Sequence, residues 1–387
     1  MRRHLLIVSI LFILVASRVS STPMTGGIGL MYVKSAQTLK PGYLDMNLGT
    51  RYFGKIANFG SEKKAYTLWT VKIFSSFNYG LNDHLELALS PVFYQDTNKG
   101  GSGFNKESVN LPDDILLSLK FGSYGSLESH FLYGGQFCIS LPTARQHNVI
   151  YEPYSAGHIA MGLTGLFSYF SNLTFPDEGW SLHCNLGYLN HNDVGVELTD
   201  NDEDPSPTAM SSEILFGIGT LFPAGTFDFS IEINARAFLN RPPETAYSRE
   251  YMSYLTPAIY YKPSRWISIE YAMDIGLLSG EDISEYTTNE TTHLAPPPTE
   301  NFPNYPSWRG ILGVKIALLP RSLYQTQEKA FREKATDRRR VIEKMLENEE
   351  NTENAEEELI RIQSERRRVE EELERLRKLL EEEKSKN

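Results

Sequence analysis

Apolar and polar residues alternate along most of the chain between residues 43 and 318. In 227–238, odd positions carry Phe, Ile and Ala, whereas even positions from 228 to 236 carry Asp, Ser, Glu, Asn and Arg. Successive side chains of a strand point to opposite faces, so this period of two predicts strands with one apolar and one polar face. The predicted strands are 43–53, 66–79, 84–94, 114–122, 130–141, 158–170, 180–190, 213–222, 227–238, 251–261, 266–277 and 308–318.

The lengths of these segments and of their connections favour a membrane barrel over a soluble β-sandwich, whose strands also alternate. Strands of about 10 to 14 residues suit a tilted transmembrane strand better than a soluble sheet. Outer-membrane barrels have short periplasmic turns and long external loops. The short connections are 80–83, 125–126, 223–225 and 262–264, and the long ones are 95–112, 142–157, 191–212 and 279–306. We therefore expect an all-β transmembrane antiparallel barrel over 43–319, with about twelve strands and ten to fourteen possible.

Residues 1–42 precede the predicted barrel. Residues 1–21 combine Arg2 and Arg3 with an apolar run at 5–16 and a small-residue exit, which predicts a cleaved signal peptide. The apolar run is too short to span a bilayer, although an N-terminal anchor helix is the alternative. The segment 22–42 contains a short strand-like run at 27–35 and belongs to none of the twelve predicted strands. Both a lumen plug and a partial strand that helps to close the barrel fit it.

The composition changes abruptly at Pro320. Residues 321–387 contain 17 Lys and Arg, 19 Asp and Glu, and neither Gly nor Pro, which is typical of a helix. An apolar seam at heptad spacing, interrupted by Arg366, consists of Leu359, Ile362, Val369, Leu373, Leu376 and Leu380. We expect 320–387 to be a periplasmic α-helical coiled coil that self-associates or binds another periplasmic helix. A solitary charged helix is the alternative.

The predicted signal peptide and the strand pattern together resemble bacterial outer-membrane β-barrel proteins, porin-like ones in particular. The resemblance implies an outer-membrane location, with lipid around the barrel and the C-terminal segment in the periplasm. Some barrels of this group carry a periplasmic domain that holds the cell wall. The charged segment 321–387 shows no globular domain of that kind. Many such barrels also end on an aromatic strand residue, whereas this chain continues beyond 318, so any insertion signal would be internal.

Charge and cysteine content limit the possible partners. A net charge of −11 argues against nucleic acid, whose binding needs clustered Lys and Arg. Cys138 and Cys184 show no spacing typical of a metal site or a disulfide framework. The acidic stretch 193–204 lacks the regular spacing of a calcium loop, which favours a solvated loop. We expect no cofactor and no metal.

Charged residues also occupy the polar face of several predicted strands. Their positions predict side chains that line the lumen, where opposed charges set selectivity in a channel or pair to fill and stiffen a closed barrel. Sequence leaves both possibilities open. The predicted lumen-lining acids are Asp45, Glu86, Asp228, Glu232, Glu270 and Asp274, and the bases are Arg51, Lys72, Lys120, Arg236, Arg309 and Lys315.

Three functions follow from this pattern, in decreasing order of support. The first is a porin-like channel for small solutes with a periplasmic coiled-coil extension. The second is a structural barrel whose coiled coil oligomerises or tethers the outer membrane to a periplasmic partner. An outer-membrane enzyme is the weakest, because no nucleophile can be placed beside the inward-facing His130 or His183. We therefore expect no enzyme activity.

Overall fold

The computed structural model of the chain describes residues 24–59, 64–100, 108–125, 129–172, 178–199, 201–264, 266–286, 304–319, 366–369 and 372. Of the predicted coiled coil, 366–369 and 372 are helical, and the rest lies outside the described residues, as does the predicted signal peptide. In these described ranges, no helix is long and apolar enough to cross a membrane.

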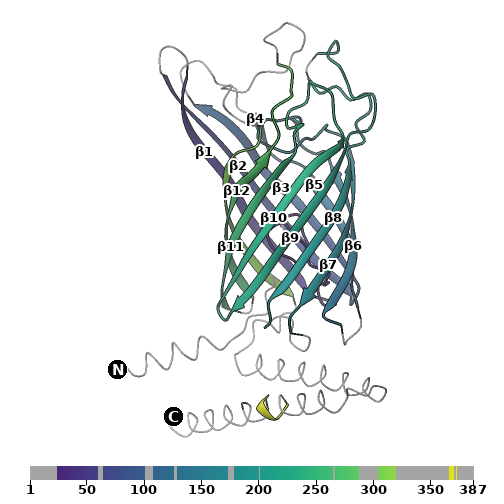
Figure 1. Cartoon of the computed structure of the whole chain (residues 1–387), viewed down its shortest axis with the longest axis vertical. Helices are drawn as coiled ribbons and strands as arrows, with labels where there is room; N and C mark the ends of the chain where they lie inside the picture. Colours follow the sequence, from purple (N-terminus) through teal and green to yellow (C-terminus); the bar gives the residue numbers. More distant parts are fainter. Residues whose placement is uncertain are drawn as a thin grey trace.

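The described strands form one antiparallel sheet that closes on itself (Figure 1). β1 pairs with both β2 and β13, and β2 pairs with β3, so the chain of pairings returns to its start. The strands are β1 (Leu44–Phe59), β2 (Lys64–Asn82), β3 (Leu85–Gly100), β4 (Ser108–Asn110), β5 (Ile115–Tyr124), β6 (Phe131–Leu141), β7 (Ala160–Phe170), β8 (Ser181–Asn190), β9 (Ser212–Ala224), β10 (Phe227–Asn240), β11 (Met252–Ser264), β12 (Ile267–Ser279) and β13 (Trp308–Leu319). β4 is a three-residue strand that pairs with the same edge of β3 as β5 does, beyond the end of β5, so it adds no separate position to the wall, which has twelve strands. The prediction of a twelve-stranded antiparallel barrel is confirmed.

The two ends of the barrel differ. We call one the turn end, because β2 and β3, and β9 and β10, are joined there by two residues each. We call the other the loop end, because it carries the long connections 142–159 and 191–211. β1 begins and β13 ends at the turn end, with Leu44 paired to Leu319. The hairpin of β1 and β2 extends beyond its neighbours at the loop end (Figure 1).

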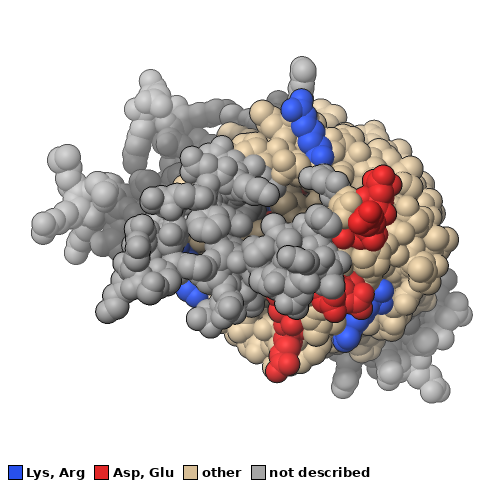
Figure 2. All heavy atoms as spheres, turned by 90° about the horizontal axis from the view of Figure 1, so that it is seen from above, with Lys and Arg blue, Asp and Glu red and all other residues tan. Residues whose placement is uncertain are grey.

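The outer wall of the barrel is apolar. Leu163 and Leu186 are 63% and 58% exposed, and many further Leu, Ile, Phe and Tyr side chains point outward beside them. Among the strand side chains that the structure describes, Lys55 is the one exposed Asp, Glu, Lys or Arg. Figure 2 looks onto the loop end, where charged side chains lie at the rim of a wall of uncharged residues. A soluble protein rarely exposes so much contiguous apolar surface, whereas a closed sheet with this wall suits lipid. The chain thus forms a β-barrel of the outer-membrane type.

Residues 24–39 lie inside this wall, and we call them the N-terminal plug. Leu30, Met31 and Val33 are almost completely buried. Met31 packs against Phe74 and Tyr260, whose strands stand on different parts of the wall. The β-bridge from Gly29 to Lys34 is internal to the plug. The segment therefore fills lumen space rather than extending the sheet.

Candidate functional site

One carboxylate in the lumen holds three consecutive backbone amides of the plug. Glu232 lies on β10 with its side chain inside the barrel and only 1% of the residue exposed. Its Oε1 accepts a hydrogen bond from the Met31 N–H at 2.6 Å. Its Oε2 accepts from Tyr32 at 2.9 Å and Val33 at 2.8 Å. Three consecutive amides converge on this one side chain, so Glu232 is the main polar clamp on the plug.

The rest of the plug is bound mainly by wall side chains, and one backbone bond, from the Ser123 N–H of β5 to the carbonyl oxygen of Ala36 at 2.7 Å, joins it to the sheet. These contacts come from strands all around the barrel, so the plug is held on every side. The donors and acceptors are Gly27 N to Asn78 Oδ1 at 2.6 Å, Tyr32 Oη to Asp274 Oδ2 at 2.6 Å, Lys34 N to Asn185 Oδ1 at 2.6 Å, Ala36 N to Ser168 Oγ at 2.8 Å and Leu39 N to Glu86 Oε2 at 2.7 Å.

Two wall glycines leave the space that the plug occupies. A Cβ on Gly122 would lie 2.2 Å from the carbonyl oxygen of Ala36. A Cβ on Gly219 would lie 2.6 Å from Cδ1 of Leu30. At Gly122 a side chain would clash with plug backbone, whereas at Gly219 it would force the Leu30 side chain to move, so both glycines fit the wall to the plug.

His183 contacts a wall serine, Ser168, that binds the plug. Its Nδ1 lies 2.8 Å from Ser168 Oγ, and its Nε2 lies 3.0 Å from Ser181 Oγ. The Ser168 hydroxyl also accepts the N–H of Ala36. No nucleophile could be placed beside His183 from the sequence, and the structure places two serine hydroxyls there. Their contacts support the plug, because Ser168 and the imidazole are buried against it.

Six of the predicted lumen residues form ion pairs with one another inside the barrel. Their spacing along the chain is long, and the antiparallel register brings them together. The pairs are Asp45 with Lys315 at 3.0 Å, Glu86 with Lys120 at 3.4 Å and Asp274 with Arg309 at 2.8 Å.

The other six predicted residues contact groups outside the predicted set. Glu232 binds the plug, and Glu270 accepts a long hydrogen bond from Asn47 at 3.4 Å. The remaining contacts are Asp228 with Lys262, Arg236 with Glu213, Arg51 with Glu152, and Lys72 with Glu152 and Asp113.

Strand parity could have identified two of these missed partners. Glu213 shares its face of β9 with Gly219, and Lys262 shares its face of β11 with the buried Tyr260. Both lie near strand ends, where alternation is hard to follow. Asp113 lies between β4 and β5, and Glu152 lies in the connection between β6 and β7. Neither belongs to a strand, so no periodic signal could have placed them inside the barrel.

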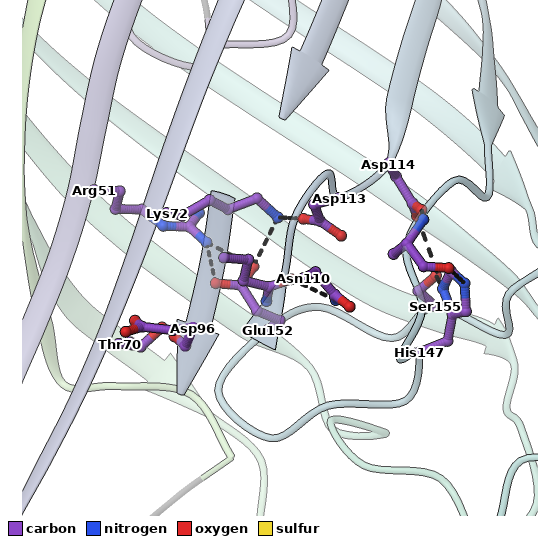
Figure 3. Close-up of polar contacts among 12 residues, drawn as sticks. Arg51, Thr70, Lys72, Asp96, Asn110, Asp113, Asp114, His147, Glu152 and Ser155 are labelled. Atoms are coloured by element: carbon purple, nitrogen blue, oxygen red, sulfur yellow. Dashed lines mark hydrogen bonds and ion pairs between the residues drawn. The ribbon is translucent and has the colours of Figure 1, made fainter. Parts of the chain in front are cut away.

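Arg51, Lys72, Asp113 and Glu152 form a cluster towards the loop end (Figure 3). Nη2 of Arg51 donates to both carboxylate oxygens of Glu152, at 2.6 and 2.7 Å. Nζ of Lys72 lies 3.3 Å from Glu152 Oε2 and 3.2 Å from Asp113 Oδ2. Burial alone would raise the pKa of Glu152, but Arg51 and Lys72 outweigh it and lower this pKa to about 2. Glu152 is therefore ionised at neutral pH and ties the loop 142–159 to the wall.

Comparison with known proteins gives distant structural neighbours. No family model and no curated protein matches the chain. An outer-membrane channel from Pseudomonas putida F1 has a TM-score of 0.48 at 12% identity, covering 73% of this chain and 98% of that one. The NanC porin has a TM-score of 0.42 at 9% identity, covering 71% and 100%. The translocator domain of the autotransporter NalP from Neisseria meningitidis has a TM-score of 0.38 at 8% identity, covering 72% and 89%. At these values the likeness adds nothing to what the strands themselves establish, which is a closed twelve-stranded barrel of the outer-membrane type with an occupied lumen.

Proposed function

We propose that this chain is an outer-membrane channel for small solutes, closed in this conformation by the N-terminal plug. The observation that carries the proposal is how the plug is held. Its amides bind wall side chains such as Glu232, Asn185 and Ser168, and among the described residues a single backbone bond, from Ser123 to Ala36, connects it to a wall strand. Water can replace side-chain hydrogen bonds of this kind at modest net free energy, so the plug is suited to leave and return.

The charged lumen supports the same function. Burying ion pairs such as Asp45 with Lys315 and Asp274 with Arg309 costs desolvation, and apolar side chains of similar size often fill such space at no loss of stability. A barrel that only had to be filled therefore gains little from these charges. A lumen that becomes aqueous when the plug moves needs them, because charged side chains then line the path of the solute.

In this proposal the turn end faces the periplasm and the loop end faces outside, as short turns and long loops do in outer-membrane barrels. The apolar outer wall contacts lipid. The cleaved signal peptide and the periplasmic coiled coil over 321–387 complete the proposal. They rest on the sequence pattern alone.

Planar-bilayer recording tests the channel. The wild-type protein should open rarely, and Glu232→Ala should open more often or to a larger conductance because it removes the acceptor of three plug amides. Glu203→Ala removes one acid from an exposed loop position and is the matched control. If neither the wild type nor Glu232→Ala conducts while both remain folded barrels, the channel is refuted.

A structural barrel is the second candidate, because a lumen filled by Met31 and its neighbours also suits a passive membrane anchor. In that case residues 321–387 carry the function by oligomerising or by tethering the membrane to a periplasmic partner. Deleting 321–387 should then change the oligomeric state in detergent or weaken the cell envelope. An unchanged oligomeric state and an intact envelope would remove this candidate.

A further inference from the structure

The cluster at the loop end brings two cations of the barrel wall next to each other. Arg51 on β1 and Lys72 on β2 are directly opposite in the antiparallel register. Like charges at opposed positions repel each other, so this pair needs an anion between them. In the structure a single carboxylate, that of Glu152, contacts both.

The anion comes from a different part of the molecule than the cations. Arg51 and Lys72 stand on adjacent strands of a closed sheet, whereas Glu152 lies in the connection 142–159. The guanidinium and ammonium groups are therefore fixed by the wall, and the carboxylate reaches them from a loop (Figure 3). A planar guanidinium with a neighbouring ammonium is a suitable receptor for any carboxylate, whether it is tethered or free.

The charge balance around the cluster depends on Glu152. Lys72 has a second acid, Asp113, at 3.2 Å, and Arg309, whose charge also acts on Glu152, pairs with Asp274. If Glu152 moves away, three cations remain with two acids, and the site carries one excess positive charge. The side chains of Lys72 and Arg51 are 21% and 10% exposed, so a solute in the adjoining space of the lumen contacts the cluster first at Lys72.

We propose that Arg51 and Lys72 form a carboxylate-binding subsite of the channel, which Glu152 occupies in the closed state and which a small carboxylate solute takes over. The inference rests on the proposed function and deepens it by naming the solute class. Glu152 then acts as an internal stand-in for the solute. To displace Glu152, the solute concentration must exceed the millimolar effective concentration that a short tether typically gives a tethered carboxylate.

Acetate is the matching probe, because Glu152→Ala deletes a fragment of that size and keeps the Cβ. Binding is measured on the refolded protein in detergent by calorimetric titration with sodium acetate, at ionic strength held constant with sodium chloride. Glu152→Ala and Glu152→Gln should each bind acetate at least about tenfold more tightly than the wild type. Adding Arg51→Gln should abolish the gain, and Glu203→Ala should match the wild type.

The wild-type protein supplies a second measurement that needs no substitution. Acetate should increase hydrogen exchange in the connection 142–159 severalfold over chloride at the same ionic strength, because it displaces Glu152. Equal exchange in the two salts would overturn the proposal. So would Glu152→Ala and Glu152→Gln variants that are folded but bind acetate no better than the wild type. Binding is measured without a membrane, so a protein that binds acetate but never conducts would keep the subsite and refute the channel.

Discussion

The clamp of Glu232 on the plug gives the sharpest test of how the lumen is closed. Glu232→Gln removes the charge and keeps the size of the side chain. One carboxylate oxygen accepts from Met31 and the other from Tyr32 and Val33, so a single amide oxygen can keep at most two of the three bonds. The Gln NH₂ group then faces the remaining N–H, and two donors cannot bond to each other.

The size of the loss follows from these bonds. An orphaned buried amide costs about 1 to 3 kcal/mol. With one amide orphaned, the plug is destabilised by about this much relative to its released state. This corresponds to roughly a fivefold to a hundredfold increase in the released population, since every 1.4 kcal/mol is a factor of about ten.

Hydrogen exchange measured by mass spectrometry reads this population directly. Peptides that contain Met31 to Val33 should exchange faster by about that factor in Glu232→Gln, while peptides from β6 and β7 keep wild-type protection and show that the wall is intact. Glu203→Gln is the control for the loss of one charge. Unchanged exchange of the plug in Glu232→Gln would refute the view that this carboxylate holds the segment in the lumen.

Three further predictions concern the fit of the plug, the outer wall and the loop. Gly122→Ala places a Cβ 2.2 Å from the carbonyl oxygen of Ala36, so limited proteolysis should cut the plug sooner while the barrel still resists heat in SDS gels. Leu186→Arg should lower the free energy of unfolding in lipid vesicles by about 2 to 4 kcal/mol, whereas a change within about 0.5 kcal/mol would indicate a water-exposed wall. Glu152, 6% exposed in its side chain, has a folded pKa of about 2 against an ordinary 4.5, so its stabilising effect is present above pH 4.5 and lost as pH falls to 2. Over that range the wild type should lose about 3 kcal/mol more than Glu152→Gln in urea titrations, and parallel curves would contradict the ion pair.

The strands of the barrel could be predicted from sequence because their signal is local. Alternation within one segment places Leu48 outside and Asn47 inside without reference to any other segment. Strand ends are less predictable. The segment 43–53 extends to Leu44–Phe59 in the structure, since pairing with β2 continues after the alternation has stopped.

The contents of the lumen were much less predictable. Periodicity places Arg51 on the inner face, but its partner Glu152 is 101 positions away in a connection without any period. The plug is similar, because 27–35 has no clear alternation and its place depends on amides that bind side chains of many strands. Alternation identified Glu232 as an inward-facing acid, whereas the amides that it binds, about 200 positions away, are evident only in the three-dimensional structure.

The two closures of the lumen use opposite chemistry and meet at one ion pair. In the plug, an acid of the wall binds backbone donors, whereas in the loop, bases of the wall bind an acid. A carboxylate solute therefore competes directly with Glu152 and has no direct effect on the clamp at Glu232. The connection between them is Asp274, which accepts the hydroxyl of Tyr32 from the plug and pairs with Arg309, whose charge acts on Glu152. Displacement of Glu152 by a carboxylate solute that later leaves would change the field at this pair, and in this way an event at the loop end can reach the plug.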